Sequence, residues 1–185
     1  MKLSRLTVPI SVIGVLVLSI AVMAQNADKE KLIDIERAFA GTPNPGAKAV
    51  AVAKEYDYAG SLSFLTITGL RATLSKPQLL ELNAKPNPAD PDVRSTQTLS
   101  DIHVDLYGDT ALVNYKQTET DAGHKNAALN RTSHIACLDT FVKRSGRWYL
   151  IGGGCASTAP ITEAEQKAVE ADVAHLPKDV QQTIH

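Results

Sequence analysis

The chain has 185 residues, of which 44% are hydrophobic, 5% aromatic and 21% charged. This composition is that of a globular protein and excludes a disordered or collagen-like chain. The 19 basic and 20 acidic residues leave a formal net charge of −1 at pH 7. Such a balance argues against a nucleic-acid-binding protein, because binding to phosphates needs a basic face that displaces counterions.

Residues 1–24 have the order of a secretory signal peptide. A short positively charged head precedes an almost wholly apolar run over residues 6–23, and small residues flank a predicted cleavage site between Ala24 and Gln25. The alternative is a retained anchor, because the run approaches the ~20 residues that a membrane span requires. We expect cleavage, an exported protein that is periplasmic or extracellular, and no stable membrane insertion afterwards.

The front of the chain predicts helices. Asp28 is placed to cap a helix over residues 28–40, whose apolar residues recur on one face. Glycines and prolines at 41–46 end that helix. The segments that follow are predicted as a helix over 47–58, a strand over 61–68 and a helix that starts at Ser75 with Pro77 in its first turn.

The back of the chain predicts strands. A proline-rich loop over 83–91 separates the two parts. Alternating apolar and polar residues then favour an antiparallel meander, and a capping box formed by Thr162 and Glu165 opens a last helix over 162–176. The predicted fold class is α+β, with an antiparallel sheet against the N-terminal helices and an extra C-terminal helix. The strands are expected over 95–107, 111–119, 132–143 and 148–157.

Two cysteines, Cys137 and Cys155, lie in the last two predicted strands, and an oxidising compartment favours their pairing. A three-residue turn between the strands, or a longer one of the same parity, places both cysteines on one face and close together. A register shifted by one residue makes them face apart. The alternative is two buried free thiols that act as small hydrophobic groups.

Three motifs together carry a family resemblance. They are Ile-Glu-Arg-Ala-Phe at 35–39, Leu-Ser-Asp-Ile-His-Val-Asp-Leu-Tyr-Gly-Asp-Thr-Ala-Leu-Val at 99–113, and Asp-Thr-Phe-Val-Lys-Arg-Ser-Gly-Arg-Trp-Tyr-Leu at 139–150. In this order they resemble the nuclear-transport-factor-2-like (NTF2-like) superfamily, and within it the SnoaL-like domains of secreted bacterial proteins of unknown function. The resemblance covers about residues 28–157.

The resemblance implies a cone, in which a strongly curved antiparallel sheet wraps around the N-terminal helices and encloses a deep pocket. It also implies frequent homodimers that associate through the sheet. The resulting division is a signal peptide over 1–24, a SnoaL-like cone domain over 25–159 and a C-terminal helical extension over 160–185. We expect that extension to dock through Ala168, Val169 and Val173, either across the mouth of the cone or on a partner subunit.

Asp139 is the best candidate for a catalytic residue, because it is the one charged residue in the apolar run 135–142. A carboxylate desolvated by apolar walls acquires the pKa of a general base. The alternative is a structural aspartate that is solvated or paired with Arg131 or Arg147. His134 lies on the opposite face of the same strand, which disfavours a His–Asp dyad there.

Aromatic side chains that combine an apolar body with a polar atom are typical of ligand pockets. We expect Tyr58, Phe64, Tyr115 and Trp148 to line the pocket, with core packing as the alternative for Trp148. His103 and Asp105 are expected on the outer face. The spacing of histidines and cysteines matches no metal motif, and no glycine-rich loop precedes a helix, so no cofactor is expected.

The predicted function is the binding of a small apolar molecule in the cone, without catalysis. One alternative is a cofactor-independent isomerase or lyase, of the ketosteroid-isomerase or polyketide-cyclase type, with Asp139 as general base and a tyrosine as hydrogen-bond donor. A further alternative is a dimerisation or interaction module, which would have an apolar outer sheet and no closed cavity. Fold alone does not decide among them.

Overall fold

A computed structural model describes the backbone of residues 10–42, 45–55, 58–65, 69–85, 91–174, 178–182 and 184. Side chains are described throughout these ranges except at residues 10–22, 55, 58–62, 64, 128, 164, 168, 169, 171, 172 and 180. The helices are α1 (Ile10–Ala40), α2 (Ala47–Glu55), α3 (Lys76–Ala84), the 3₁₀ turn η1 (Ala127–Leu129), α4 (Glu163–Val173) and α5 (Lys178–Gln181). The strands are β1 (Tyr58–Leu65), β2 (Arg71–Ser75), β3 (Arg94–Tyr107), β4 (Thr110–Ala122), β5 (Thr132–Arg144) and β6 (Arg147–Ser157).

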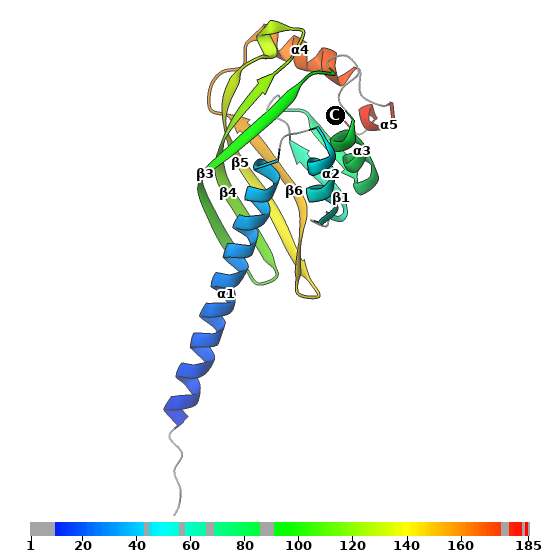
Figure 1. The fold of residues 1–185 in the computed structure, drawn as a ribbon. Coiled ribbons are helices and arrows are strands. Elements are labelled where there is room, and N and C mark those ends of the chain that lie inside the picture. Colours follow the sequence, from blue (N-terminus) through cyan, green and yellow to red (C-terminus); the bar gives the residue numbers. More distant parts are fainter. Residues whose placement is uncertain are drawn as a thin grey trace, which may run out of the picture.

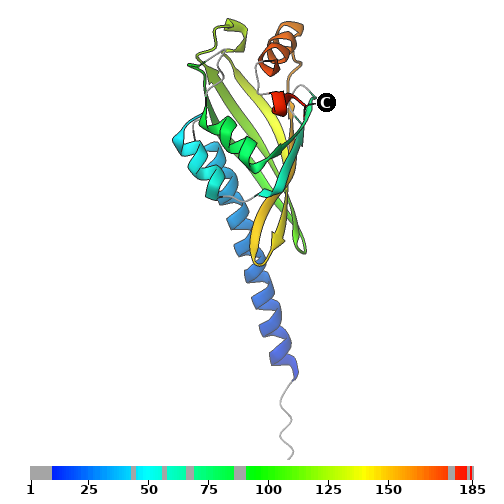
Figure 2. The same ribbon diagram turned by 90° about the vertical axis from the view of Figure 1, so that its right-hand side faces the viewer.

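The strands form one sheet in the order β2-β1-β6-β5-β4-β3 (Figure 1). Strands β3 to β6 are the predicted antiparallel meander. At the other edge, β1 pairs with β6 in parallel and with β2 in antiparallel orientation. Helices α1, α2 and α3 lie on one side of the curved sheet (Figure 2). The α+β class and the curved sheet are therefore confirmed.

The hydrophobic core lies between α1 and the concave face of the sheet. Leu32 and Ile35 of α1 pack with alternate residues of the strands, of which Val113 and Phe141 are almost fully buried. This alternation follows from the two-residue period of a strand, which sends successive side chains to opposite faces. The core cluster contains Leu32, Ile35, Val104, Ala111, Val113, Phe141 and Trp148.

The expectation that Asp28 caps a helix is wrong. Helix α1 begins at Ile10 and continues through position 28, so its backbone needs no cap there. The Asp28 carboxylate instead accepts hydrogen bonds from Lys143 Nζ at 2.7 Å and from Trp148 Nε1 at 3.0 Å. Burial opposes the charge on Asp28, but these two donors outweigh it and lower the pKa of that carboxyl. Asp28 therefore ties α1 to the hairpin of β5 and β6.

The front of the chain differs in detail from the prediction. Strand β1 begins at Tyr58, where a helix was expected, and the short strand β2 was missed. The end of the expected strand, at 66–68, lies outside the described residues. The start of α3 matches the prediction: Ser75 is the N-cap of a capping box with Gln78, and Pro77 lies in the first turn.

The turn between β5 and β6 is shorter than the expected three-residue loop. It consists of Ser145 and Gly146, both with positive φ, between the paired residues Arg144 and Arg147. A bulge at Ile151, which has no partner in β5, then shifts the register by one residue. Because of this shift, Cys137 lies directly opposite Cys155, and the two form a disulfide.

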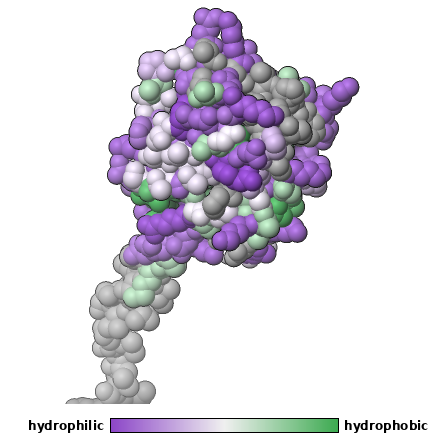
Figure 3. Space-filling view, turned by 45° about the horizontal axis from the view of Figure 1, so that its top comes forward, coloured by the Kyte–Doolittle hydropathy of each residue, from purple (hydrophilic) through white to green (hydrophobic). Residues whose placement is uncertain are grey.

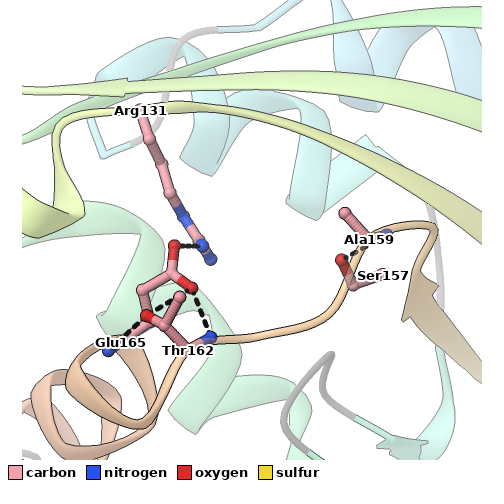
Figure 4. Close-up of polar contacts among 5 residues, drawn as sticks. All are labelled: Arg131, Ser157, Ala159, Thr162 and Glu165. Atoms are coloured by element: carbon pink, nitrogen blue, oxygen red, sulfur yellow. Dashed lines mark hydrogen bonds and ion pairs between the residues drawn. The ribbon is translucent and has the colours of Figure 1, made fainter.

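The C-terminal extension packs at the end of the sheet where β4 and β5 are joined (Figure 1). Thr162 and Glu165 form the predicted capping box, and Glu165 also pairs with Arg131 at the start of β5 (Figure 4). Farther along, Asp179 of α5 accepts a hydrogen bond from Gln78 of α3 at 3.0 Å. The extension thus runs from the β4–β5 connection to α3, and the expected contacts of Ala168 and Val169 lie outside the described side chains.

Among the described residues, no helix is both long and apolar enough to span a membrane.

Reduction of the Cys137–Cys155 disulfide is expected to destabilise the protein. The bridge joins residues 18 positions apart. Closing a loop of that length lowers the conformational entropy of the unfolded chain, which raises the free energy of unfolding by roughly 3 kcal/mol. Urea denaturation with and without a reductant measures the loss. The Cys137→Ala/Cys155→Ala variant is the control, and its stability should not respond to the reductant. Equal stability of the oxidised and reduced wild-type protein would contradict the prediction.

Candidate functional site

A cluster of polar groups lies on the concave face of the sheet, beneath α1. In β4, Val113, Tyr115 and Gln117 share this face, and in β5 it carries Cys137, Asp139 and Phe141, as the register of the two strands requires. Tyr115 Oη donates a hydrogen bond of 2.9 Å to Asp139 Oδ2. Two of the residues singled out from the sequence are therefore brought together.

Glu36 of α1 completes the cluster. Its side chain is only 3% exposed, and its carboxyl hydrogen-bonds to Asp139. The other oxygen, Glu36 Oε1, is buried and has no hydrogen-bond partner. Buried polar atoms without partners are rare, because leaving one unpaired costs about 1–3 kcal/mol. We call Glu36, Tyr115 and Asp139 the acid cluster.

Burial and mutual repulsion set the protonation states of the acid cluster. Burial, together with the nearby Asp139, raises the pKa of Glu36 to about 9. Burial also raises the pKa of Asp139, to about 6, although hydrogen bonds from Tyr115 and Glu36 limit the rise. Burial and the carboxylates of Asp139, Glu36 and Glu119 raise the pKa of the Tyr115 hydroxyl. Near neutral pH, Glu36 is thus a protonated donor and Asp139 is an ionised acceptor.

Gly153 of β6 makes room for Asp139. The two residues are partners across the β5–β6 ladder, and a Cβ atom on Gly153 would lie 1.8 Å from Asp139 Oδ1. The Asp139 carboxyl therefore rests directly over the backbone of Gly153. A side chain at this position is incompatible with the observed rotamer of Asp139.

A second polar group extends the concave face toward the start of β3. Ser95 Oγ and Gln97 Nε2 both donate to Glu119 Oε1, at 2.7 and 3.0 Å. Burial, followed by the charge of Glu119, raises the pKa of Asp121 at the end of β4. The concave face thus changes from apolar in the core to acidic near the β4–β5 connection.

A cavity of about 130 Å³ opens between α1, α2 and this second polar group. Phe39 lies one turn of α1 beyond Glu36, but none of the acid-cluster residues lines the cavity. Its lining combines apolar side chains from α1 and α2 with hydrogen-bonding side chains, two of which come from β3. The lining residues are Phe39, Thr42, Ala49, Val52, Asn83, Ser95 and Gln97.

The other expected pocket residues lie elsewhere or are not described. Trp148 belongs to the hydrophobic core and donates to Asp28, which is the core-packing alternative. Tyr58 and Phe64 lie in β1, but their side chains are outside the described residues. His134 is exposed on the opposite face from Asp139, as expected, and His103 pairs with Asp105 at the surface.

The outer face of the sheet has a wide, open groove with a mainly apolar lining. Leu65 and Leu138 are exposed there, at 49% and 41%, and the glycines at 152–154 also line it. The surface at the α4 end is mostly hydrophilic, with scattered apolar residues (Figure 3).

In the part of the chain that the structure describes, no group of three or more His, Cys, Asp or Glu residues is arranged to hold a metal ion.

Sequence reasoning found Asp139 and Tyr115 but missed Glu36. The signal was present, because Glu36 lies between Leu32 and Phe39 on the apolar face of the first predicted helix. An acidic residue four positions after a core leucine points to the core and not to solvent. Such a residue stays buried only with a partner or a proton.

The architecture has many solved counterparts. A protein of unknown function from Mycobacterium tuberculosis matches with a TM-score of 0.59 at 16% identity, over 89% of this chain and 95% of its own. An NTF2-like protein of unknown function from Prochlorococcus marinus matches with a TM-score of 0.53 at 15% identity, over 72% and 94%. A proposed dehydratase of the NTF2-like family from Streptomyces avermitilis matches with a TM-score of 0.52 at 16% identity, over 74% and 99%.

These similarities show that the chain has the NTF2-like fold, and the superfamily resemblance drawn from the three motifs is confirmed at that level. No family model matches the chain, and no curated protein does either. The narrower SnoaL-like grouping stays a prediction.

The stability of the protein is expected to fall as the pH rises from about 6 to about 9. The folded state keeps a proton on Glu36 up to a pKa of about 9, whereas the unfolded chain releases it near the ordinary value of 4.5. Raising the pH in this window therefore favours unfolding, by at most about 1.4 kcal/mol per pH unit for one proton. Asp139 adds to the same trend below a pH of about 6.

Glu36→Gln should flatten this dependence, because a neutral amide replaces the protonated carboxyl. Urea denaturation at pH 6, 7, 8 and 9 gives the slopes. Glu30→Gln, on the exposed side of the same helix, is the matched control and should keep the wild-type slope. Parallel curves for the wild type and Glu36→Gln would show that Glu36 is not held protonated.

Gly153→Ala is expected to destabilise the protein by about 1–3 kcal/mol, because the added methyl group and the Asp139 carboxyl occupy the same space. The effect should shrink in an Asp139→Ala background, where that carboxyl is absent. A double-mutant cycle measured by urea denaturation gives the coupling. Additive effects would mean that Gly153 is constrained by the backbone alone and not by Asp139.

Proposed function

We propose that the protein binds a small molecule inside the cone, between α1, α2 and the concave face of β3 to β5. The observation that carries the proposal is the cavity of about 130 Å³, whose lining combines apolar side chains of α1 and α2 with the hydrogen-bonding groups of Asn83, Ser95 and Gln97. A small number of convergent polar groups in a concave, partly apolar space is the usual form of a ligand site.

We also propose that the protein works outside the cytoplasm. The Cys137–Cys155 disulfide supports this, because structural disulfides form and persist in oxidising compartments. The signal-like order of residues 1–24 points the same way. The bacterial periplasm and the extracellular space both satisfy these conditions.

The binding function is tested by blocking the cavity. Ala49 is 7% exposed and lines the cavity, so Ala49→Leu fills much of its 130 Å³. A small-molecule thermal-shift screen of the full chain should yield compounds that raise the melting temperature, since a ligand that binds only the folded state stabilises it. Ala49→Leu should weaken each such compound at least tenfold.

Ala51→Leu is the matched control, because Ala51 is exposed on the same helix, and it should bind as the wild type does. Compounds that stabilise Ala49→Leu as much as the wild type would exclude the cavity as the site. A screen without any binder would count against the function itself.

A second candidate function is proton transfer, as in a cofactor-independent isomerase or lyase. The observation that favours it is the pairing of an ionised Asp139 with a protonated Glu36, because two carboxyl groups with separated pKa values supply a base and an acid at one place. The similarity in fold to a proposed dehydratase is consistent with this reading. Asp139→Asn should then abolish turnover of a bound carbonyl compound while binding persists, and full turnover in this variant would exclude Asp139 as the base.

A further inference from the structure

We propose that the cavity binds a neutral carbamoyl group, as found in a primary amide or a urea. This inference rests on the proposed binding function and specifies the chemical class of the ligand. It uses only side chains that line the cavity, namely Phe39, Thr42, Ala49, Val52, Asn83, Ser95 and Gln97.

The two amide side chains of the lining each keep one hydrogen-bond donor and one acceptor. Asn83 Nδ2 donates to Leu79 O at 2.8 Å, and Gln97 Nε2 donates to Glu119 Oε1 at 3.0 Å. Because a backbone carbonyl and a carboxylate only accept, these bonds fix which end of each amide is the nitrogen. Among the described residues, the carbonyl oxygen and the second N–H of both amides have no partner. Each amide therefore offers a ligand an acceptor beside a donor.

The two hydroxyl groups of the lining are left as acceptors. Thr42 Oγ1 donates to Ala38 O at 2.8 Å, and Ser95 Oγ donates to Glu119 Oε1 at 2.7 Å. A hydroxyl has one hydrogen and two lone pairs, so these bonds use its donor and leave acceptor capacity. Together with the two amide oxygens, the polar lining has more acceptors than donors. A ligand that fits it must bring N–H or O–H groups.

The charge of the lining limits the ligand further. None of the seven described lining residues is charged, and a charged group that enters such a space loses its hydration without meeting a countercharge. A carboxylate would also bring only acceptors, both to the lining and toward Glu119 behind Ser95 and Gln97. The group that binds is therefore neutral.

A carbamoyl group meets these conditions. Its N–H donors lie beside a carbonyl acceptor, so it can form two hydrogen bonds with the remaining donor and acceptor of an amide side chain. At roughly 30 Å³ for a group the size of water, a space of about 130 Å³ holds about four non-hydrogen atoms. Urea and acetamide have this size, and Phe39, Ala49 and Val52 offer apolar contacts to their flat faces.

Probes of equal size separate the classes. Urea and acetamide carry N–H donors, acetone has the same shape without a donor, acetate is charged, and ethylene glycol represents hydroxyl compounds. Each is titrated at millimolar concentration into the ¹⁵N-labelled full chain and followed by NMR chemical shifts. Urea should bind at least tenfold more tightly than acetone or acetate, because two additional neutral hydrogen bonds are worth about a factor of ten. Equal or tighter binding of acetone, acetate or ethylene glycol would overturn the carbamoyl proposal.

A pair of variants then locates the contact. Gln97→Met keeps the approximate size of the side chain and removes its amide, so it should weaken the binding of urea at least fivefold. Gln166→Met is the matched control, because Gln166 Nε2 also donates to a glutamate, Glu170, at 2.9 Å and lies outside the lining of the cavity. This control should bind urea as the wild type does. Unchanged binding in Gln97→Met, or an equal loss in both variants, would overturn the proposed contact.

The outcomes distinguish the two proposals. If urea and acetamide do not bind while the screen finds other ligands that Ala49→Leu blocks, the carbamoyl class is wrong and the cavity function holds. If urea binds equally well to the wild type and to Ala49→Leu, the cavity is excluded as its site. The comparison of the probes on the wild-type protein remains decisive should any variant fail to fold.

Discussion

The burial of one carboxyl group, that of Glu36, is the constraint on which the organisation of the concave face depends. Helix α1 crosses the sheet so closely that residues 32, 35 and 36 are all buried, and an acid on that face must either keep its proton or find a partner. Asp139 and Tyr115 are the partners that β5 and β4 provide. The core is therefore continuous with a polar centre that hydrophobic packing alone would not produce.

Such a centre costs stability and gains chemical capability. A fully apolar replacement of a buried ionisable pair is often neutral or stabilising, so folding alone does not account for the presence of three interacting polar groups here. The stabilising contributions lie elsewhere in the structure: in the Leu32–Val113–Phe141 core, in the link from Asp28 to Lys143, and in the disulfide. This division is typical of sites held by a rigid scaffold.

Local sequence patterns predicted the meander well, because much of β3 and β4 alternates apolar and polar residues and the strands are separated by recognisable turns such as the one at Gly108. They predicted Asp139 from its apolar neighbours and Tyr115 only as one aromatic residue among several. The Glu36 contact joins residues more than 100 positions apart, and no local pattern encodes that approach. The same holds for the parallel pairing of β1 with β6 and for Asp28, whose helix starts earlier than its own neighbourhood indicates.

Ile151, the residue of β6 that has no partner in β5, determines the register of the second half of the hairpin. The two-residue turn at Ser145 and Gly146 on its own would set Cys155 opposite Ala136, with its side chain on the outer face, and would move Gly153 away from Asp139. Ile151 restores the phase halfway along the hairpin. The turn and the bulge compensate for each other, because a turn longer by one residue without the bulge would give the same register. Among related sequences, a deletion at one of these places should therefore accompany an insertion at the other. A hairpin whose total length differs by one residue should lack the pairing that holds Asp139 over Gly153.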